Sequence, residues 1–200
     1  MSTEQTIFVV DDDQAVCRAL ASAGALLGHP VREFGTAAEF LTAYHPSNPG
    51  CLVLDIKMPG MTGLELQRKL ADDGVTIPIV MISGHADVRI AVEAMTLGAV
   101  TLLEKPFRLD ELLAQVRKAL ERDRENRAAQ QRSAEAASRL AQLTPKEREV
   151  LEMIAAGKTN REMASTLQLS VRAVEDRRAR LMKKVQVRSV AELIQMLNAR

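Results

Sequence analysis

Four short apolar runs in the first half of the chain most constrain its fold. They lie at residues 7–10, 51–54, 77–82 and 101–103, and they are continuous and rich in β-branched residues. Runs of this length and composition predict strands that are buried on both faces, which is typical of a parallel sheet. A shorter strand is predicted at residues 31–34.

Amphipathic stretches with helix start signals separate the predicted strands. The segments 36–39 (TAAE) and 62–65 (TGLE) have the spacing of a capping box, and apolar residues recur at helical spacing after Asp87 and Leu109. The resulting order is βαβαβαβαβα, with connections that predict right-handed crossovers covering both faces of the sheet. The predicted fold is therefore an α/β domain with a doubly wound sheet of five parallel strands. It resembles the flavodoxin-like folds, in which the strand order is 2-1-3-4-5.

The second half of the chain is organised differently. Residues 123–142 are rich in Arg, Glu, Gln and Ala, contain no Gly or Pro, and predict a solvated helix that continues the preceding one. A coiled-coil seam is an alternative there, although polar residues interrupt it. Capping-box spacings at 144–147, 159–162 and 189–192 and a cap at Ser170 then predict four short helices that contain a helix-turn-helix.

Charge divides the chain in the same place. The whole chain has a formal net charge of +1, but residues 1–122 sum to −5 and residues 123–200 to +6. This asymmetry predicts that any contact with nucleic acid belongs to the second half.

Two further features concern the compartment. Cys17 and Cys51 lie in apolar stretches with no partner at metal or redox spacing, which indicates small buried hydrophobic residues in a reducing environment. No signal-peptide pattern and no run of about 18 apolar residues is present, so we expect a cytoplasmic protein that does not span a membrane.

Residues suited to phosphoryl chemistry follow the predicted strands. Asp11 and Asp12, Asp55, Ser83 and Lys105 each stand at the end of a run, and the carboxyl ends of parallel strands share one edge of a sheet. Crowded carboxylates favour a divalent cation, and an all-oxygen site suits Mg2+. Asp55 would attack a phosphoryl group and form an acyl phosphate, while Ser83 and Lys105 stabilise the phosphoryl oxygens.

With Pro106 after Lys105, these residues make the segment 5–122 resemble the receiver domain of bacterial two-component response regulators. The resemblance implies that Asp55 accepts phosphate, that Ser83 is the switch hydroxyl and that Lys105 pairs with the phosphate. Receivers also tend to hold this Lys-Pro peptide in cis. The implied ligands of Mg2+ are Asp11, Asp12, Asp55 and the backbone carbonyl of Lys57.

Leu102 departs from the receiver pattern, because receivers usually have Tyr or Phe three residues before the lysine. In receivers that ring turns inward when the switch hydroxyl moves to the phosphate, and leucine has no ring to turn. We therefore expect the phosphorylated and unphosphorylated forms to differ less than is usual. Lys57 and His85 are expected to flank the route of water and to tune dephosphorylation, with simple solvation as the alternative.

Residues 140–198 resemble the LuxR-type helix-turn-helix of NarL/FixJ response regulators, through LTPKEREVL at 143–151 and TNREMA at 159–164. The resemblance implies that the helix at 171–184 enters the major groove of DNA. Its predicted apolar stripe is Val171, Val174, Leu181 and Val185. The expected DNA contacts are Arg172, Arg177, Arg178 and Lys183 on phosphates and Glu175, Asp176 and Ala179 on bases.

The chain is thus identified as a response regulator with a receiver at 1–122, a helical linker at 123–142 and a LuxR-type DNA-binding domain at 143–200. The resemblance implies phosphorylation by a sensor histidine kinase, homodimer formation and binding to promoter DNA, with RNA polymerase as a further partner. An Mg2+-dependent phosphatase is one alternative, although no substrate cleft is evident. A receiver whose partner is a protein, with a merely solvated basic tail, is another.

Overall fold

The computed structural model describes residues 4–84 and 87–198. Contacts divide the chain into two units, Met1–Asn126 and Arg127–Arg200, and the boundary lies within one continuous helix, α5 (Leu109–Ala141). The first unit has a hydrophobic cluster on each face of its sheet, and the second unit has a core of its own. Each unit therefore has the buried apolar core that is typical of a domain.

The first unit is built on a parallel sheet of five strands, which run in the order β2-β1-β3-β4-β5. This arrangement confirms the predicted doubly wound fold. The central strands are almost entirely buried, whereas both edge strands include exposed residues, which explains the continuous apolar runs of the centre. The strands are β1 (Thr6–Val10), β2 (Val31–Phe34), β3 (Gly50–Asp55), β4 (Ile79–Ser83) and β5 (Thr101–Glu104).

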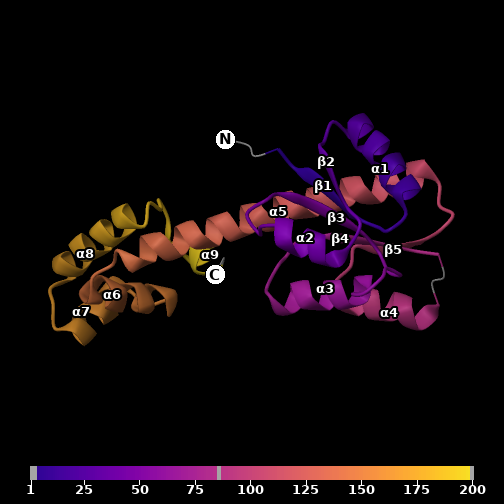
Figure 1. The fold of residues 1–200 in the computed structure, drawn as a ribbon. Coiled ribbons are helices and arrows are strands. Elements are labelled where there is room, and N and C mark those ends of the chain that lie inside the picture. Colours follow the sequence, from indigo (N-terminus) through magenta and orange to yellow (C-terminus); the bar gives the residue numbers. More distant parts are fainter. Residues whose placement is uncertain (1–3, 85–86, 199–200) are drawn as a thin grey trace. The chain divides into compact units, whose positions relative to one another are not determined.

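Helices cover both faces of this sheet (Figure 1). On one face, α2 (Ala37–Ala43), α3 (Gly63–Asp72) and α4 (Val88–Thr96) pack over the side chains of alternate strand residues. On the other, α1 (Gln14–Leu27) and the first part of α5 do so. Cys17 and Cys51 are buried free thiols on that second face, as predicted.

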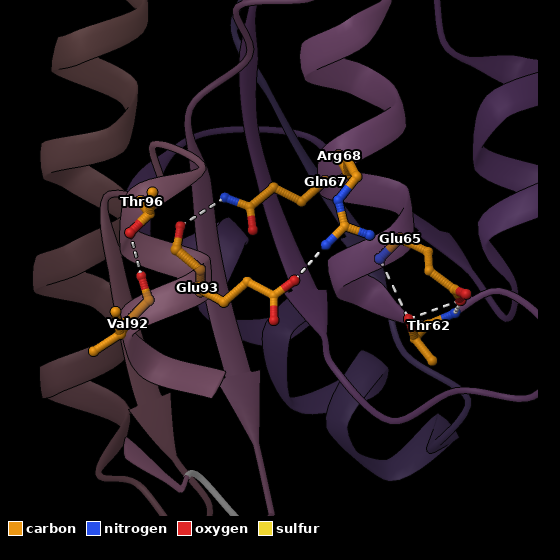
Figure 2. Close-up of polar contacts among 8 residues, drawn as sticks. Thr62, Glu65, Gln67, Arg68, Val92, Glu93 and Thr96 are labelled. Carbon is orange, nitrogen blue, oxygen red and sulfur yellow. Dashed lines mark hydrogen bonds and ion pairs between the residues drawn. The ribbon is translucent and has the colours of Figure 1, made fainter. Parts of the chain in front are cut away.

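The last turn of α4 is held by two neighbouring residues of α3 (Figure 2). The buried amide of Gln67 donates to the Ala94 carbonyl at 2.9 Å, and Arg68 forms an ion pair with Glu93. The outer face of α4 is apolar and uncovered. Its exposed fractions are 79% at Val88, 59% at Val92 and 49% at Met95.

In the described part of the second unit, four helices follow the end of α5, which confirms the predicted all-α domain. They are α6 (Pro145–Ala155), α7 (Asn160–Leu167), α8 (Val171–Lys184) and α9 (Val190–Asn198). All four contribute to one core, in which Val150, Met163, Val174, Leu181 and Leu193 are fully buried. No helix in the described residues combines the length and hydropathy that a bilayer-spanning segment requires.

Two of the predicted capping boxes have a different geometry. Thr36 accepts from the Glu39 N–H, but the Glu39 carboxylate accepts from Gly35, the residue before the cap. Glu192 likewise accepts from the N–H of Arg188. At Thr36 the reason is the backbone: its φ is −145°, whereas φ lies between −66° and −75° at the caps of the three complete boxes. The N–H of Thr36 is therefore oriented differently.

The expectation that the helix is solvated from Asp123 onward is wrong at Asp123 itself, because only 2% of this residue is exposed. Its carboxylate accepts from the side-chain amide of Gln5 at 3.0 Å and from the N–H of Gly50 at 2.9 Å. Arg124 donates to the other end of the same Gln5 amide at 2.8 Å. A buried acid is tolerated here because each of these polar groups has a partner.

Candidate functional site

Asp11, Asp55 and Lys105 meet at the carboxyl edge of the sheet. Asp11 directly follows β1, Asp55 ends β3 and Lys105 directly follows β5. The Nζ atom of Lys105 lies 2.7 Å from a carboxylate oxygen of Asp11 and 2.7 Å from one of Asp55. Because both acids are almost fully buried, the ammonium group compensates two charges that would otherwise repel each other.

The charges of this cluster influence one another. Burial raises the pKa of Asp55 and the nearby Asp11 adds to this, while hydrogen bonds from Lys105 and from the Lys57 N–H act in the opposite direction. Burial by itself would lower the pKa of Lys105, but its hydrogen bonds to Asp11 and Asp55 raise it above the ordinary value. Lys105 is therefore a cation at neutral pH.

Other predicted site residues lie near this cluster with varied exposure. Ser83 ends β4, is fully buried, and its carbonyl accepts from the Lys105 N–H at 2.7 Å. The peptide bond between Lys105 and Pro106 is cis, as in the receivers that the sequence resembles. The side chains of Asp12 and Lys57 are exposed. His85 lies outside the described residues.

Leu102 of β5 is half-buried and packs against the core cluster that also contains Ala94 of α4 and Met81 of β4. A leucine at this position therefore keeps an apolar contact with the core, although it has no ring.

The oxygen donors of this edge suit a hard divalent cation. Two carboxylates, those of Asp11 and Asp55, already reach a single ammonium group, so they can reach a single metal ion as well. Mg2+ is commonly bound by one or two carboxylates together with water. Within residues 4–84 and 87–198 no set of three His, Cys, Asp or Glu side chains is arranged around one point, which agrees with the exposure of Asp12.

A hollow of about 330 Å3 adjoins Asp11 and Asp12. It is open to solvent and leaves room for water beside these two acids, and neither Asp55 nor Lys105 lines it. The lining residues beyond the two acids are Gln14, Cys17, Arg18, Glu33, Phe34 and Gly35.

Gly63 allows α3 to approach the backbone of Asp55 closely, a role that the sequence did not predict. It is the first residue of α3, and its N–H donates to the Ile56 carbonyl at 3.0 Å. A Cβ atom at this position would lie 2.2 Å from the backbone oxygen of Asp55. The sequence does show a glycine just after a helix cap. The reason for this glycine, however, is the close approach of α3 to β3.

We expect Gly63→Ala to lower the free energy of unfolding by about 2 kcal/mol, because overpacking a tight contact forces backbone shifts. Because the shift occurs at Asp55, which the resemblance to receivers implies is the phosphoacceptor, we also expect slower phosphorylation. Urea denaturation and phosphorylation rates test both effects. Gly35→Ala is the control, because a Cβ atom there has no neighbour closer than 3.7 Å. Wild-type stability of Gly63→Ala would contradict the prediction.

Helix α8 carries the residues that are expected to contact DNA. Val174, Leu181 and Val185 are fully buried, as predicted, but Val171 is 40% exposed and does not belong to the stripe. Val171 is the first residue of α8, so the core behind the helix does not cover it. Among the expected contacts, Arg177 and Arg178 are half-buried. The exposed ones are Arg172, Glu175, Asp176, Ala179 and Lys183.

An ion pair fastens the end of α8 to α6. Lys184 donates to the Glu147 carboxylate at 2.7 Å, and this carboxylate also accepts from the N–H of the cap residue Thr144 at 2.9 Å. The hydrogen bond from Lys184, followed by the one from Thr144, lowers the pKa of Glu147 to about 2.

Because the pKa of Glu147 is depressed in the folded state, its ion pair stabilises the protein above pH 4.5 and is lost as the pH falls toward 2. We expect Glu147→Gln, which keeps a capping side chain, to cost about 1 kcal/mol at pH 7 and progressively less below pH 4.5. Denaturation at several pH values measures this difference. The exposed Glu149→Gln on the same helix is the control, and a cost for Glu147→Gln that is independent of pH would contradict the argument.

Comparisons with known proteins match both units of the chain. Residues 7–117 match the response regulator receiver domain, and residues 141–197 match the bacterial regulatory proteins of the luxR family. Nodulation protein W of Bradyrhizobium diazoefficiens is 42% identical over 98% of this chain and 86% of its own length. Transcriptional regulatory protein FixJ of Azorhizobium caulinodans is 40% identical over 95% of this chain and 90% of its own length.

Solved structures show the same relationship. The response regulator StyR covers 98% of this chain and 100% of its own, with 36% identity and a TM-score of 0.87. Full-length FixJ from B. japonicum covers 99% and 98%, with 37% identity and a TM-score of 0.60. FixJ and StyR are named as regulators, and the matched luxR family is one of regulatory proteins, so the phosphatase alternative is set aside. The chain belongs to the response regulators that join a receiver domain to a LuxR-family DNA-binding domain.

Proposed function

We propose that the protein is a phosphorylation-controlled transcriptional regulator in which a sensor histidine kinase phosphorylates Asp55. The observation that carries this proposal is the buried Asp55 carboxylate 2.7 Å from the Lys105 ammonium group. A carboxylate oxygen of Asp55 attacks the phosphorus atom and the P–N bond to the kinase histidine breaks, so that the imidazole leaves with a proton from solvent. Lys105 then pairs with the phosphoryl oxygens.

The proposed cofactor is Mg2+, held by Asp11, Asp12, Asp55 and the Lys57 carbonyl. When bound, the ion offsets the negative charge that the acids and the phosphoryl group bring together. Asp12 would join the set from its exposed position at the rim. The Lys57 side chain, which is also exposed, and His85 are proposed to influence how water reaches the acyl phosphate and hence its lifetime.

The proposed output of the receiver is a homodimer formed through α4 and β5. Its support is the uncovered apolar face of α4, because exposed apolar patches commonly mark protein interfaces. In this proposal the Ser83 hydroxyl moves to the phosphate. Leu102, which packs against the core cluster that contains Ala94 of α4, passes the change to that helix. Leu102 transmits less than an aromatic ring would, because its side chain is smaller.

We expect Leu102→Tyr to enlarge the effect of phosphate on dimerisation. Coupling free energies between sites are typically about 1 to 3 kcal/mol, and the wild type should lie at or below the lower end. Sedimentation velocity with and without acetyl phosphate measures the shift in both proteins. Leu102→Met preserves the volume without adding a ring and serves as the control. A wild-type shift as large as that of Leu102→Tyr would contradict the prediction.

In the second unit, α8 is proposed to enter the major groove of promoter DNA. We propose that Arg172 and Lys183, which are exposed on α8, contact phosphates together with the half-buried Arg177 and Arg178. Glu175, Asp176 and Ala179 are the proposed base contacts. RNA polymerase is the proposed partner on the promoter, and the cytoplasm, which holds the DNA, is the proposed location.

Genome-wide binding of the wild type and of Asp55→Ala tests the proposal. We expect the wild type to occupy discrete promoters under inducing conditions and the variant to lose most of this occupancy. Equal occupancy by both proteins would remove the role of phosphate, whereas a lack of discrete sites in the wild type would remove the role in transcription.

A further inference from the structure

Asn160 of α7 bridges two oppositely charged residues of α8. Its carbonyl oxygen accepts from the guanidinium group of Arg178, and its amide nitrogen donates to the Glu175 carboxylate at 3.4 Å. Glu175 and Arg178 stand one turn apart, on the edge of α8 nearest to the start of α7. DNA contacts were predicted for both of these residues but not for Asn160.

The backbone of Asn160 is fixed by its surroundings. It is the first residue of α7 and directly follows Thr159, whose capping box with Glu162 has hydrogen bonds of 2.7 and 3.3 Å. Behind it, Met163 of α7 and Val174 of α8 are fully buried in a shared core. The side chain of Asn160 therefore extends toward α8 from a rigid position.

A carboxamide is suited to this bridge because it accepts through oxygen and donates through nitrogen. Without it, Glu175 and Arg178 could pair directly, since side chains three residues apart on a helix are neighbours. In the bridged arrangement each charged group bonds to Asn160 through a single atom. Glu175 keeps a second oxygen and Arg178 keeps further N–H groups for other partners.

We propose that Asn160 is a positioning residue for base recognition, which keeps the Glu175 carboxylate away from Arg178 and available to a base edge. In the major groove, a free carboxylate oxygen accepts a hydrogen bond from the exocyclic amino group of cytosine. This inference rests on the proposed entry of α8 into that groove.

The test begins with selection of a duplex from a random library by the full-length protein, phosphorylated with acetyl phosphate. Dissociation constants are then measured for the selected duplex and for each single base-pair change. We expect Asn160→Ala to weaken discrimination by about tenfold at the base pair that Glu175→Ala also affects, a size within that of one good base contact. The dependence of affinity on salt should stay that of the wild type, because Asn160 carries no charge and Arg178, when paired with Glu175, keeps further N–H groups for a phosphate.

Two further variants separate positioning from a structural role. Asn160→Asp keeps an acceptor for Arg178 but places a like charge beside Glu175, so it should lose discrimination as Asn160→Ala does. In the double variant Asn160→Ala, Arg178→Ala, the competing cation is absent, and part of the discrimination should return. If Asn160→Ala had merely misfolded the domain, the second substitution Arg178→Ala would not restore base discrimination. Arg172→Ala is the control for a phosphate contact, and it should reduce the salt slope by about one without changing base preference.

The inference is overturned if Asn160→Ala keeps the full base discrimination of the wild type. It is also overturned if that variant weakens binding equally for all sequences and reduces the salt slope, because Asn160 would then contact phosphate itself. If the wild type selects no sequence, or if Glu175→Ala changes no base preference, the proposed groove reading by α8 fails and the inference fails with it. Those results differ from a failure of Asn160 alone.

Discussion

Asp55→Asn is expected to take up no phosphoryl group from either acetyl phosphate or a histidine kinase. The substitution preserves the shape of the side chain and an oxygen for the Lys105 hydrogen bond. It removes the negative charge, and a neutral amide oxygen does not form an acyl phosphate. Phosphate-affinity electrophoresis measures the modified fraction, and lability to hydroxylamine identifies an acyl phosphate in the wild type.

The matched control for this variant is Asp73→Asn. Asp73 is an exposed acid at the end of α3, where it pairs with Lys69 at 3.1 Å. This control should be phosphorylated to the same extent as the wild type. Phosphorylation of Asp55→Asn at the wild-type rate would show that another residue is the acceptor.

Lys105→Ala is expected to lower the free energy of unfolding by about 3 kcal/mol, because removal of one partner leaves buried charges uncompensated. Two acids are affected, since Asp11 and Asp55 share this single ammonium group. Urea denaturation of the full chain measures the loss in the transition of the first unit. Mg2+ should restore part of the stability, because a cation that binds the folded state at these acids replaces the missing charge.

Two comparisons show whether charge compensation is the cause. Lys69→Ala removes an exposed lysine from an ion pair, and we expect a cost of at most about 1 kcal/mol. In the double variant Lys105→Ala, Asp55→Asn, one of the repelling charges is gone, so stability should exceed that of Lys105→Ala alone. Equal stability of the single and double variants would mean that lost packing, and not charge, explains the effect of Lys105→Ala.

The sheet was predictable from the sequence because its central strands are buried on both faces. Such strands require continuous apolar runs, and the runs at β1, β3 and β4 are of this kind. The meeting of Asp11, Asp55 and Lys105 was predictable as well, since parallel strands bring their carboxyl ends to one edge. Capping residues marked most helix starts, because a cap acts within a few residues of the chain.

Contacts between distant segments were not predictable in this way. Asp123 lies in a segment whose composition is typical of a solvated linker. It is nevertheless buried, because it bonds to Gln5 and Gly50, which are 118 and 73 residues away in the sequence. The need for glycine at position 63 cannot be seen in its own segment, because the atom that excludes a side chain belongs to Asp55. Val171 fits the apolar period of α8, but the core does not extend to this first residue of the helix.

The order of strands and helices along the chain, the residue types at the strand ends and the charge of each half follow from the amino-acid pattern, because these depend on local spacing and on the topology of parallel strands. Which side chains share a partner depends on the folded arrangement. Lys105 between two acids and Asn160 between Glu175 and Arg178 are such cases. The physical reason is that a hydrogen bond or ion pair depends on distances of about 3 Å, which packing sets and sequence spacing does not.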